Sequence, residues 1–369
     1  MTTPRSGMAR LAEELALERA KVADRSPPYE RALEHLPTVL EGAEGRYVAA
    51  AWEHRTFIVP GERAQLLLAA LRADARAEGP GHPLYEGFGA PAPRAGAVTE
   101  AAIRAGLSPD RERVYDALAQ RWVAIEEPAR AVAWLWPAAL AGASRGARPL
   151  AIAEVGARAG LNLVADSLPH GWTFTDGEEV EAARGVRTIA RLGLDPAPLD
   201  ALRPGDAEWL RSCVWPCDAE RAARLEQALA AFVAARARPD APVLLPIAAR
   251  NAPARLDLLS GRVPDALVLA YQTHLRERLA QDERAEYEAG MIAWLATHPP
   301  GRALWVELEP ARTGESSMIV AHAREVDGRV RTFELARCEP HLCELARDRE
   351  AVEALRALLA PQGAAALPA

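Results

Sequence analysis

The sequence predicts an α/β protein in which an all-helical domain precedes a mostly parallel sheet that ends in an antiparallel hairpin. Up to about residue 135 the apolar residues recur at helical spacing, without a strand pattern. From residue 150 onward short apolar runs alternate with helical stretches, which is typical of βαβ units. Two runs of alternating residues, 318–322 and 329–335, flank the turn pair Asp327-Gly328 and predict the hairpin. The two expected domains are residues 1–135 and 136–369.

The helical domain is expected to be built around a helix at 61–77. Four leucines between residues 66 and 71 form an apolar stripe there, and glycines and prolines at 78–83 stop the helix. Further helices are expected at 9–23, 29–40, 98–106, 110–124 and 127–143. We expect this domain to be a helical cap that packs on the next one.

Five apolar runs predict the parallel strands of the second domain. These runs are 150–155, 170–176, 242–247, 266–270 and 303–309. The stretch from 189 to 216 is expected to be a long insertion. In the last of the five strands Glu307 and Glu309 fall on the same side, because side chains alternate along a strand.

The first apolar run ends in a glycine turn. Glu154 stands at its far end, and Gly156 and Gly160 follow before a helix that starts near residue 161. Such a turn leaves free backbone N–H groups at a helix N-terminus, which suit an anionic or polar ligand group. An acid at the strand end can accept hydrogen bonds from a ribose or an amine.

The spacing of the glycines discriminates among three classes of cofactor. A P-loop requires a lysine, and the only lysine of the chain is Lys21. A dinucleotide site requires a middle glycine where this chain has Arg158. The remaining pattern, Glu-x-Gly with a second glycine four residues later, is similar to the first motif of class I S-adenosylmethionine-dependent methyltransferases. Those enzymes also carry a third glycine at the position of Arg158.

Other motifs extend the resemblance over most of the chain. Residues 154–163, 193–200, 209–210 and 214–216 resemble an uncharacterised bacterial family, a domain of unknown function with a Rossmann-like, methyltransferase-type domain behind a helical N-terminal region. Five βα strands followed by a hairpin are also the order that class I methyltransferases show. Two departures stand out. The family has Thr-Asn-Glu where this chain keeps only Glu127, and it has His-Ser or His-Thr where this chain has Gln272-Thr273.

The resemblance implies a cofactor site and an acceptor site at the carboxyl ends of the strands. The cofactor, S-adenosylmethionine, would be held by Glu154, Gly156, Ala157, Arg158, Gly160, Asn162, Asp176 and Gln272. Asp176 would hold the ribose at the end of the second strand, and no acid follows the third strand. The candidates on the acceptor side are Glu127, Tyr271 and His274.

Composition limits the partners. The net charge is −7, so the chain lacks the basic surface of a nucleic-acid- or membrane-binding protein. Without an apolar signal core or a run long enough to cross a bilayer, the protein is expected in the cytoplasm. The cysteines form two close pairs, Cys213 with Cys217 and Cys338 with Cys343, and His341 lies beside the second. Their spacing is looser than that of common zinc ribbons, so we expect no metal, although zinc stays open.

These patterns predict methyl transfer from S-adenosylmethionine to a small-molecule acceptor. One alternative is a non-catalytic binding or assembly protein that keeps the fold and has lost the cofactor. Arg158 and the missing acid after the third strand favour it. A nicotinamide-dependent oxidoreductase is a further alternative, disfavoured by the absent middle glycine. The oligomeric state is left open, a homo-oligomer included.

Overall fold

The chain forms two compact units in the computed structural model. The structure describes residues 7–142, 148–183, 187–311, 316–338 and 344–360. One unit, Met1–Ile125 with Leu202–Leu225, is helical, and the other, Glu126–Ala201 with Glu226–Ala369, contains the sheet. The chain therefore divides at residue 125 rather than 135, and the helical unit also takes in a segment from the middle of the sequence.

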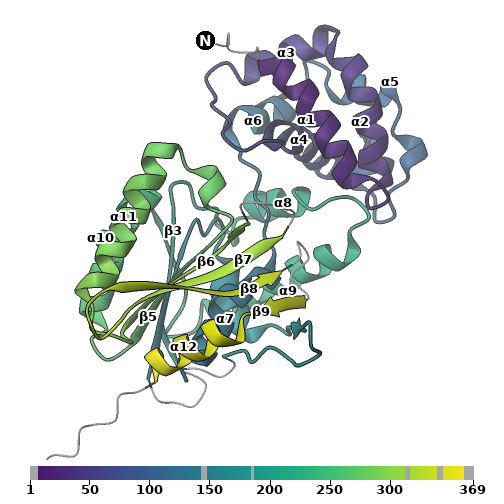
Figure 1. The fold of residues 1–369 in the computed structure, drawn as a ribbon. Coiled ribbons are helices and arrows are strands. Elements are labelled where there is room, and N and C mark those ends of the chain that lie inside the picture. The colour runs from purple at the N-terminus through teal and green to yellow at the C-terminus, as the bar shows by residue number, and fades with distance from the viewer. Residues whose placement is uncertain (1–6, 143–147, 184–186, 312–315, 339–343, 361–369) are drawn as a thin grey trace, which may run out of the picture. The chain divides into compact units, whose positions relative to one another are not determined.

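The helical unit is organised around a buried central helix. Its α-helices are α1 (Gly7–Val22), α2 (Pro27–Leu40), α3 (Ala43–Ala51), α4 (Glu62–Glu78), α5 (Glu100–Gly106), α6 (Glu112–Gln120) and α8 (Pro204–Ser212), and α9 (Ala219–Ala235) begins in it. Shorter helical turns are η1 (Gly79–Gly81), η2 (Tyr85–Gly89) and η3 (Ala95–Ala97). The expected leucine stripe is confirmed on α4, where Leu66 and Leu67 are fully buried. Figure 1 labels these helices.

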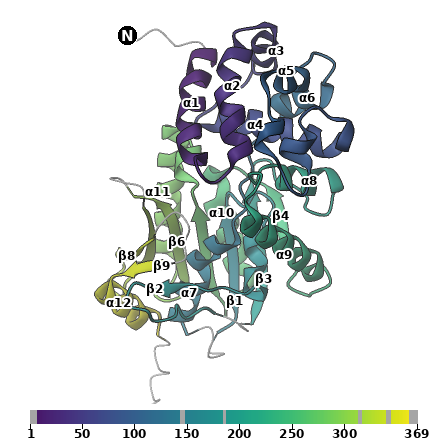
Figure 2. The same ribbon diagram turned by 90° about the vertical axis from the view of Figure 1, so that its right-hand side faces the viewer.

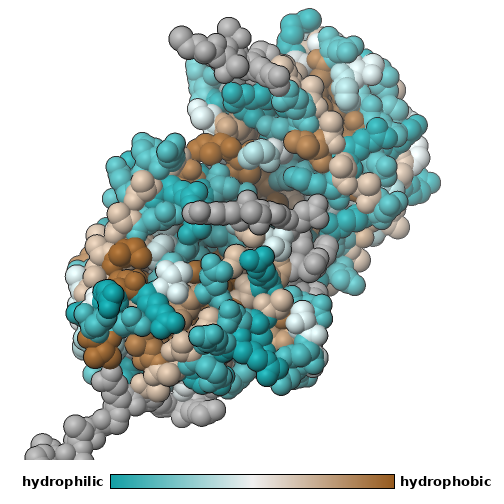
Figure 3. All heavy atoms as spheres, viewed as in Figure 1, coloured by the Kyte–Doolittle hydropathy of each residue, from teal (hydrophilic) through white to brown (hydrophobic). Residues whose placement is uncertain are grey.

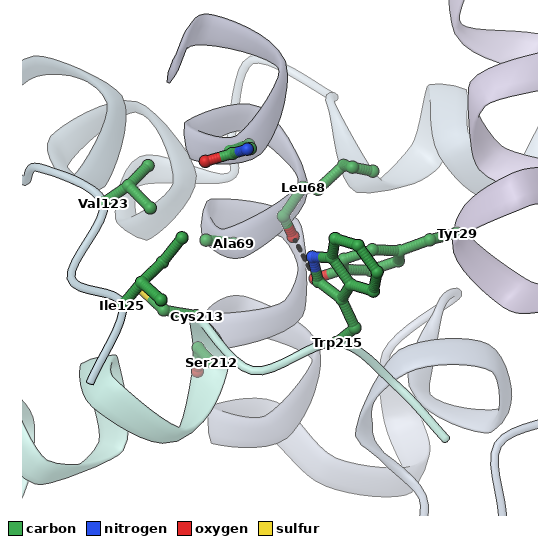
Figure 4. A pocket seen from close by; sticks show the side chains of 9 residues that line it. Tyr29, Leu68, Ala69, Val123, Ile125, Ser212, Cys213 and Trp215 are labelled. Carbon is green, nitrogen blue, oxygen red and sulfur yellow. Dashed lines mark hydrogen bonds between the residues drawn. The ribbon is translucent and has the colours of Figure 1, made fainter. Parts of the chain in front are cut away.

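The segment after α8 packs against α2 and α4 of the same unit. Figure 4 shows Cys213 and Trp215 around a small pocket, with the hydroxyl of Tyr29 directed at the carbonyl of Leu68. The Tyr29 hydroxyl donates to that carbonyl oxygen at 3.3 Å. The hydroxyl of Ser26 donates to the carbonyl oxygen of Pro216 at 2.7 Å. These buried contacts explain why residues from the middle of the sequence belong to the helical unit.

The other unit contains one large, mostly parallel sheet. Its strands are β1 (Leu150–Val155), β2 (Thr173–Phe174), β3 (Thr188–Asp195), β4 (Val243–Pro246), β5 (Leu267–Thr273), β6 (Ala303–Pro310), β7 (Ser317–Arg324), β8 (Val330–Cys338) and β9 (Glu344–Arg347). Their order in the sheet is β2-β9-β8-β7-β6-β5-β1-β3-β4. Strands β6, β5, β1, β3 and β4 are neighbours in this order and run parallel to one another. The neighbouring pairs β6–β7, β7–β8 and β8–β9 are antiparallel. The hairpin predicted at Asp327-Gly328 is confirmed, with Gly328 at φ +90°.

Helices cover both faces of the sheet. The helices of this unit are α7 (Val132–Leu140), α10 (Ala252–Arg262), α11 (Gln281–Thr297) and α12 (Arg349–Leu359), with short turns η4 (Pro128–Ala131), η6 (Leu161–Ser167), η7 (Ala249–Asn251) and η8 (Arg276–Arg278). Helices α10 and α11 lie on one face and α7 and α12 on the other (Figures 1 and 2). Small side chains of the central strands, among them Ala151, Ala153 and Ala270, let α10 and α11 approach closely and bury Tyr287 and Met291. β1 is buried along its whole length, as expected of a central parallel strand.

The second parallel strand differs from the prediction. The run at 170–176 yields only the two-residue strand β2, which pairs with β9 at the far edge of the sheet. The strand beside β1 is β3, within the stretch expected to be an insertion. Arg191 in β3 hid the apolar pattern, because its side chain is fully buried although it is charged.

The surface of the sheet unit is mainly hydrophilic in the view of Figure 3, with small separate hydrophobic patches. Exposed large apolar residues such as Val326 and Leu258 are scattered over several elements. Among the helices of the described residues, none has both the length and the hydropathy that a bilayer span requires.

Candidate functional site

The glycine turn lies at the point where the order of the parallel strands reverses. β1 pairs with β3 on one side and with β5 on the other. After β1 the chain adds β3 and β4 on one side of β1, and then it adds β5 and β6 on the other side. In open α/β sheets ligands bind beyond the carboxyl ends of the strands at such a switch point. Residues that follow β1, β3 and β5 are therefore the candidates for a site.

The turn needs its glycines for both backbone conformation and packing. Gly156 and Gly160 have φ values of +81° and +69°, in the left-handed region. A Cβ atom at Gly156 would lie 2.9 Å from Leu275 Cδ1, and one at Gly160 would lie 2.6 Å from Leu244 Cδ2. Side chains of this chain thus occupy the space beside both glycines. Arg158 also has a positive φ, +49°.

The N–H groups of the turn are all bound within the chain. The hydrogen bonds run from Gly156 N to Leu194 O (2.7 Å), Ala157 N to Leu194 O (3.2 Å), Arg158 N to Asp195 Oδ2 (3.1 Å), Ala159 N to Glu126 Oε1 (3.1 Å) and Gly160 N to Ala157 O (2.6 Å). The sequence predicted free N–H donors for an anionic group, and this prediction is wrong. Two of the donors face carboxylates, which would repel a phosphate.

Glu126 is a buried carboxyl group that the sequence reading missed. It precedes η4, and its Oε1 accepts the N–H of Ala159 inside the glycine turn. Burial raises its pKa to about 7, although that hydrogen bond and the charges of Arg158 and Arg130 lower it. The neighbouring Glu127, the residue chosen from the family pattern, instead accepts the N–H of Ala129 at 3.3 Å as the N-cap of η4.

Glu154 lies at the centre of the site, at the end of β1. Its Oε1 accepts from Asn162 Nδ2 at 3.3 Å, and burial together with the charge of Glu126 raises its pKa well above the usual range. Tyr271 is its register neighbour on β5: the Tyr271 hydroxyl lowers the pKa of Glu154, whereas burial and the charge of Glu154 raise the pKa of Tyr271. Glu154 Oε2, Asn162 Oδ1 and Tyr271 Oη are buried and have no hydrogen-bond partner among the described residues. Buried polar atoms are normally paired, so these three atoms make the surroundings of Glu154 the candidate site.

Asp195 occupies the position that the sequence assigned to Asp176. It ends β3, next to the turn, and its two oxygens accept the N–H groups of Arg158 (3.1 Å) and Ala197 (2.9 Å). Asp176 follows β2 at the opposite edge of the sheet, so its predicted place beside the turn is wrong. The side chain is partly exposed and pairs with Arg347 and Arg349, whose hydrogen bonds lower its pKa to about 2.

Gln272 points away from the glycine turn. Neighbouring side chains alternate along a strand, so Tyr271 faces Glu154 while Gln272 faces α11. Its Nε2 donates to Glu309 Oε1 at 2.7 Å, and its Oε1 accepts from Tyr287 (2.5 Å) and Trp305 (3.2 Å). The prediction that Gln272 lies at the cofactor is wrong, because its amide belongs to a buried network on the other face.

His274 follows β5 with a left-handed backbone, φ +51°. Burial and the charges of Arg130 and Arg278 lower its pKa to about 3, so the imidazole is neutral at physiological pH. Its Nε2 lies 3.5 Å from Ser317 Oγ. Glu307 and Glu309 share one side of β6, as the sequence predicted. Glu307 forms a hydrogen bond with His322, and Glu309 accepts the N–H of Leu275 in the loop after β5.

The cysteines lie in both units. Cys213 is buried and Cys217 exposed in the helical unit, whereas Cys338 is buried in the sheet unit. His341 and Cys343 lie outside the described residues. Within the part of the chain that the structure describes, no three His, Cys, Asp or Glu side chains gather as metal ligands would.

The pH dependence of stability should report the buried state of Glu126. Because its folded-state pKa is raised, the stability associated with this group is fully present below about pH 4.5 and is lost as the pH rises through about 7. Glu126→Gln keeps an acceptor for Ala159 N and cannot ionise. Urea unfolding at pH 5 and pH 8 should show that the variant loses about 1–3 kcal/mol less over this interval than the wild type. If the wild type and Glu126→Gln lose equal stability between pH 5 and pH 8, the raised pKa of Glu126 is contradicted. Glu309→Gln serves as a comparison, because the pKa of Glu309 is also raised to about 7.

Comparison with known proteins identifies a family model. The model described as "Uncharacterized protein conserved in bacteria (DUF2332)" matches residues 13–344. No curated protein and no solved structure matches the sequence.

Proposed function

Since this chain belongs to the bacterial family DUF2332, whose description carries no activity, we propose its function from the chemistry of the switch point. We propose that it binds S-adenosylmethionine there and transfers the methyl group to a small-molecule acceptor. The order of the parallel strands, β4-β3-β1-β5-β6, supports the proposal because it is the order of the first five strands in Rossmann-type sheets.

The observation that carries the proposal is the charge of the site. Three carboxyl groups, Glu126, Glu154 and Asp195, surround the glycine turn, and two of them already accept its N–H groups. A pyrophosphate placed there would meet like charge in a medium of low dielectric. A sulfonium and an amino group, both positive, would instead offset the cost of burying these carboxylates. The set therefore favours S-adenosylmethionine over a dinucleotide, and disfavours the oxidoreductase.

The residues around the turn would divide the work. Glu154, Asn162 and Tyr271 offer unpartnered polar atoms to the bound molecule. Arg158, half-buried at the turn, adds a positive charge beside Glu126. When bound, S-adenosylmethionine supplies an electrophilic methyl group, so the protein contributes mainly by aligning the acceptor with it. His274, with its pKa lowered to about 3, is too weak a base to take a proton from the acceptor near neutral pH, so we assign it no proton transfer.

A specific observation also favours the non-catalytic alternative. Leu275 and Leu244 fill the space beside Gly156 and Gly160, and the N–H groups between them are bound internally. A turn built in this way also serves as a rigid joint between β1 and η6. The two alternatives make opposite predictions for ligand binding.

Calorimetry separates them. We expect heat of binding with S-adenosylmethionine and with its demethylated product, and none with a reduced nicotinamide dinucleotide. Asp195→Asn should weaken the affinity at least about tenfold, since it removes a carboxylate charge and one acceptor beside the turn. Asp176→Asn is the matched control, at the other edge of the sheet, and should bind as the wild type does. No heat with either sulfur ligand up to about millimolar concentration would reject the proposal and leave the non-catalytic protein.

A further inference from the structure

The side chains of Glu154 and Asn162 share one hydrogen bond, and within the described part of the chain each keeps one oxygen atom that receives no hydrogen bond. Asn162 Nδ2 donates to Glu154 Oε1 at 3.3 Å. The remaining oxygens, Glu154 Oε2 and Asn162 Oδ1, have no hydrogen-bond partner among the described residues. The two residues are only 3% and 5% exposed, so bulk water does not satisfy these atoms. If Glu154 is ionised, both oxygens are acceptors and nothing in the pair can donate between them.

A single proton resolves this. A carboxamide and a neutral carboxylic acid that face one another complement each other's donors and acceptors: the amide N–H donates to one carboxyl oxygen, and the acid O–H donates to the amide oxygen. We propose that, without ligand, Glu154 is a neutral carboxylic acid whose Oε2–H donates to Asn162 Oδ1, and that a cationic ligand displaces this proton. The structure shows the first of the two hydrogen bonds, and the second uses the two unpartnered oxygens.

The charged surroundings of Glu154 support the neutral form. The titratable groups that face it are Glu126 from the segment before η4, Asp195 from the end of β3 and Tyr271 from β5. Burial is the largest contribution that raises the pKa of Glu154, and the charges of Glu126 and Asp195 raise it further. The Asn162 amide and the Tyr271 hydroxyl lower this pKa. In the described residues no Lys, Arg or His forms an ion pair with Glu154. The arginines of this region, Arg158 and Arg130, act on Glu126 instead. Burial and the repulsion from Glu126 thus raise the pKa of Glu154 in the direction that the hydrogen-bond pattern requires.

This neutral acid gives the site a defined response to a cation. In the step proposed, the neutral acid of Glu154 and a free cation become the carboxylate–cation pair, and one proton passes to the solvent. This second part rests on the function proposed above, with a sulfonium or amino group as the cation. Affinity should then rise with pH, by at most about tenfold per pH unit, until Glu154 ionises without ligand.

Infrared spectroscopy tests the first part without a ligand. At pH 7 the carboxyl groups of Glu126 and Glu309, whose pKa values are about 7, are partly protonated as well, so the contribution of Glu154 is read from difference spectra. The wild type minus Glu154→Gln should show the carbonyl band of a protonated carboxylic acid, and the band should shift when the glutamates carry ¹³C. The same difference measured in the Glu126→Gln background should keep the band. Absence of the band from both differences would overturn the proposal.

Calorimetry with S-adenosylmethionine in two buffers of different ionisation enthalpy tests the second part. The wild type should release about one proton per ligand bound near neutral pH. Glu154→Gln keeps the pairing with Asn162 but not the charge, so it should bind at least about tenfold more weakly and release no proton from this site. Binding by the wild type without proton release would reject displacement of the proton. Absence of binding at all would reject the proposed function and the displacement together, while the infrared result would still decide the resting state of Glu154.

Discussion

Arg191→Met is expected to lower the free energy of unfolding by about 3–5 kcal/mol, the cost of removing one partner from a buried ion pair. The Arg191 side chain is fully buried, and its Nη2 and Nε lie 2.8 Å from Asp166 Oδ2 and Asp240 Oδ2. Its Nη1 also donates to the carbonyl oxygen of Leu163. Methionine fills similar space but leaves two poorly exposed carboxylates and a buried carbonyl without their donor.

Urea unfolding followed by circular dichroism measures this loss. Arg356→Met is the matched control, because Arg356 pairs with Glu353 on the exposed face of α12. Exposed pairs of this kind contribute about 0–1 kcal/mol, so the control should unfold nearly as the wild type does. A loss of about 1 kcal/mol or less for Arg191→Met would mean that Arg191 does not connect β3 to η6 energetically.

Gly160→Ala is expected to cost about 2–4 kcal/mol. The left-handed backbone of Gly160 accounts for about 1–2 kcal/mol with any residue that carries a Cβ. The rest arises from overpacking, because the new Cβ would lie 2.6 Å from Leu244 Cδ2 and 3.3 Å from Leu163 Cδ1. Since Gly160 is the N-cap of η6, which carries Asn162, the same substitution should also disturb the site around Glu154.

Gly177→Ala separates the two contributions. Gly177 has φ +85°, and no atom lies within 4 Å of the position of its added Cβ, so only the backbone cost applies there. We expect Gly177→Ala to lose about 1–2 kcal/mol. In a Leu244→Ala background Gly160→Ala should cost less than in the wild type, and the difference in this double-mutant cycle measures the overpacking. If Gly160→Ala and Gly177→Ala unfold at the same urea concentration, the turn is not packed as described.

The apolar periodicity of the sequence predicted the strands that are buried almost along their whole length. The apolar runs at 266–270 and 303–309 are found in β5 and β6, and the glycine turn does follow β1. β3 was missed because burial there depends on a charge pair: Arg191 meets Asp166 and Asp240, which lie far from it in the sequence. A charged residue inside a strand reads as exposed until its partners are known.

The sequence predicted some residues of the candidate site and missed two of its carboxyl groups, Glu126 and Asp195. Glu154, Asn162 and Tyr271, chosen from the sequence, lie together at the switch point, and their roles stay predictions. Asp195 had a usable signal, an acid at the end of the run Leu-Gly-Leu-Asp, but the assignment of the second strand to another segment concealed it. Glu126 had none, because nothing local tells which of two adjacent acids will turn toward residue 159.

The sequence by itself determined that an α/β sheet follows a helical region, that a glycine turn leaves the first central strand, and that the chain carries the motifs of its family. Period and turn chemistry are local properties, so they can be read from neighbouring residues. Only the tertiary structure decided which strand lies beside β1 and that the N–H groups of the turn face Glu126 and Asp195. Strand order and burial arise from contacts between residues distant in the sequence, and these contacts leave the turn without the free N–H groups that an anion would need.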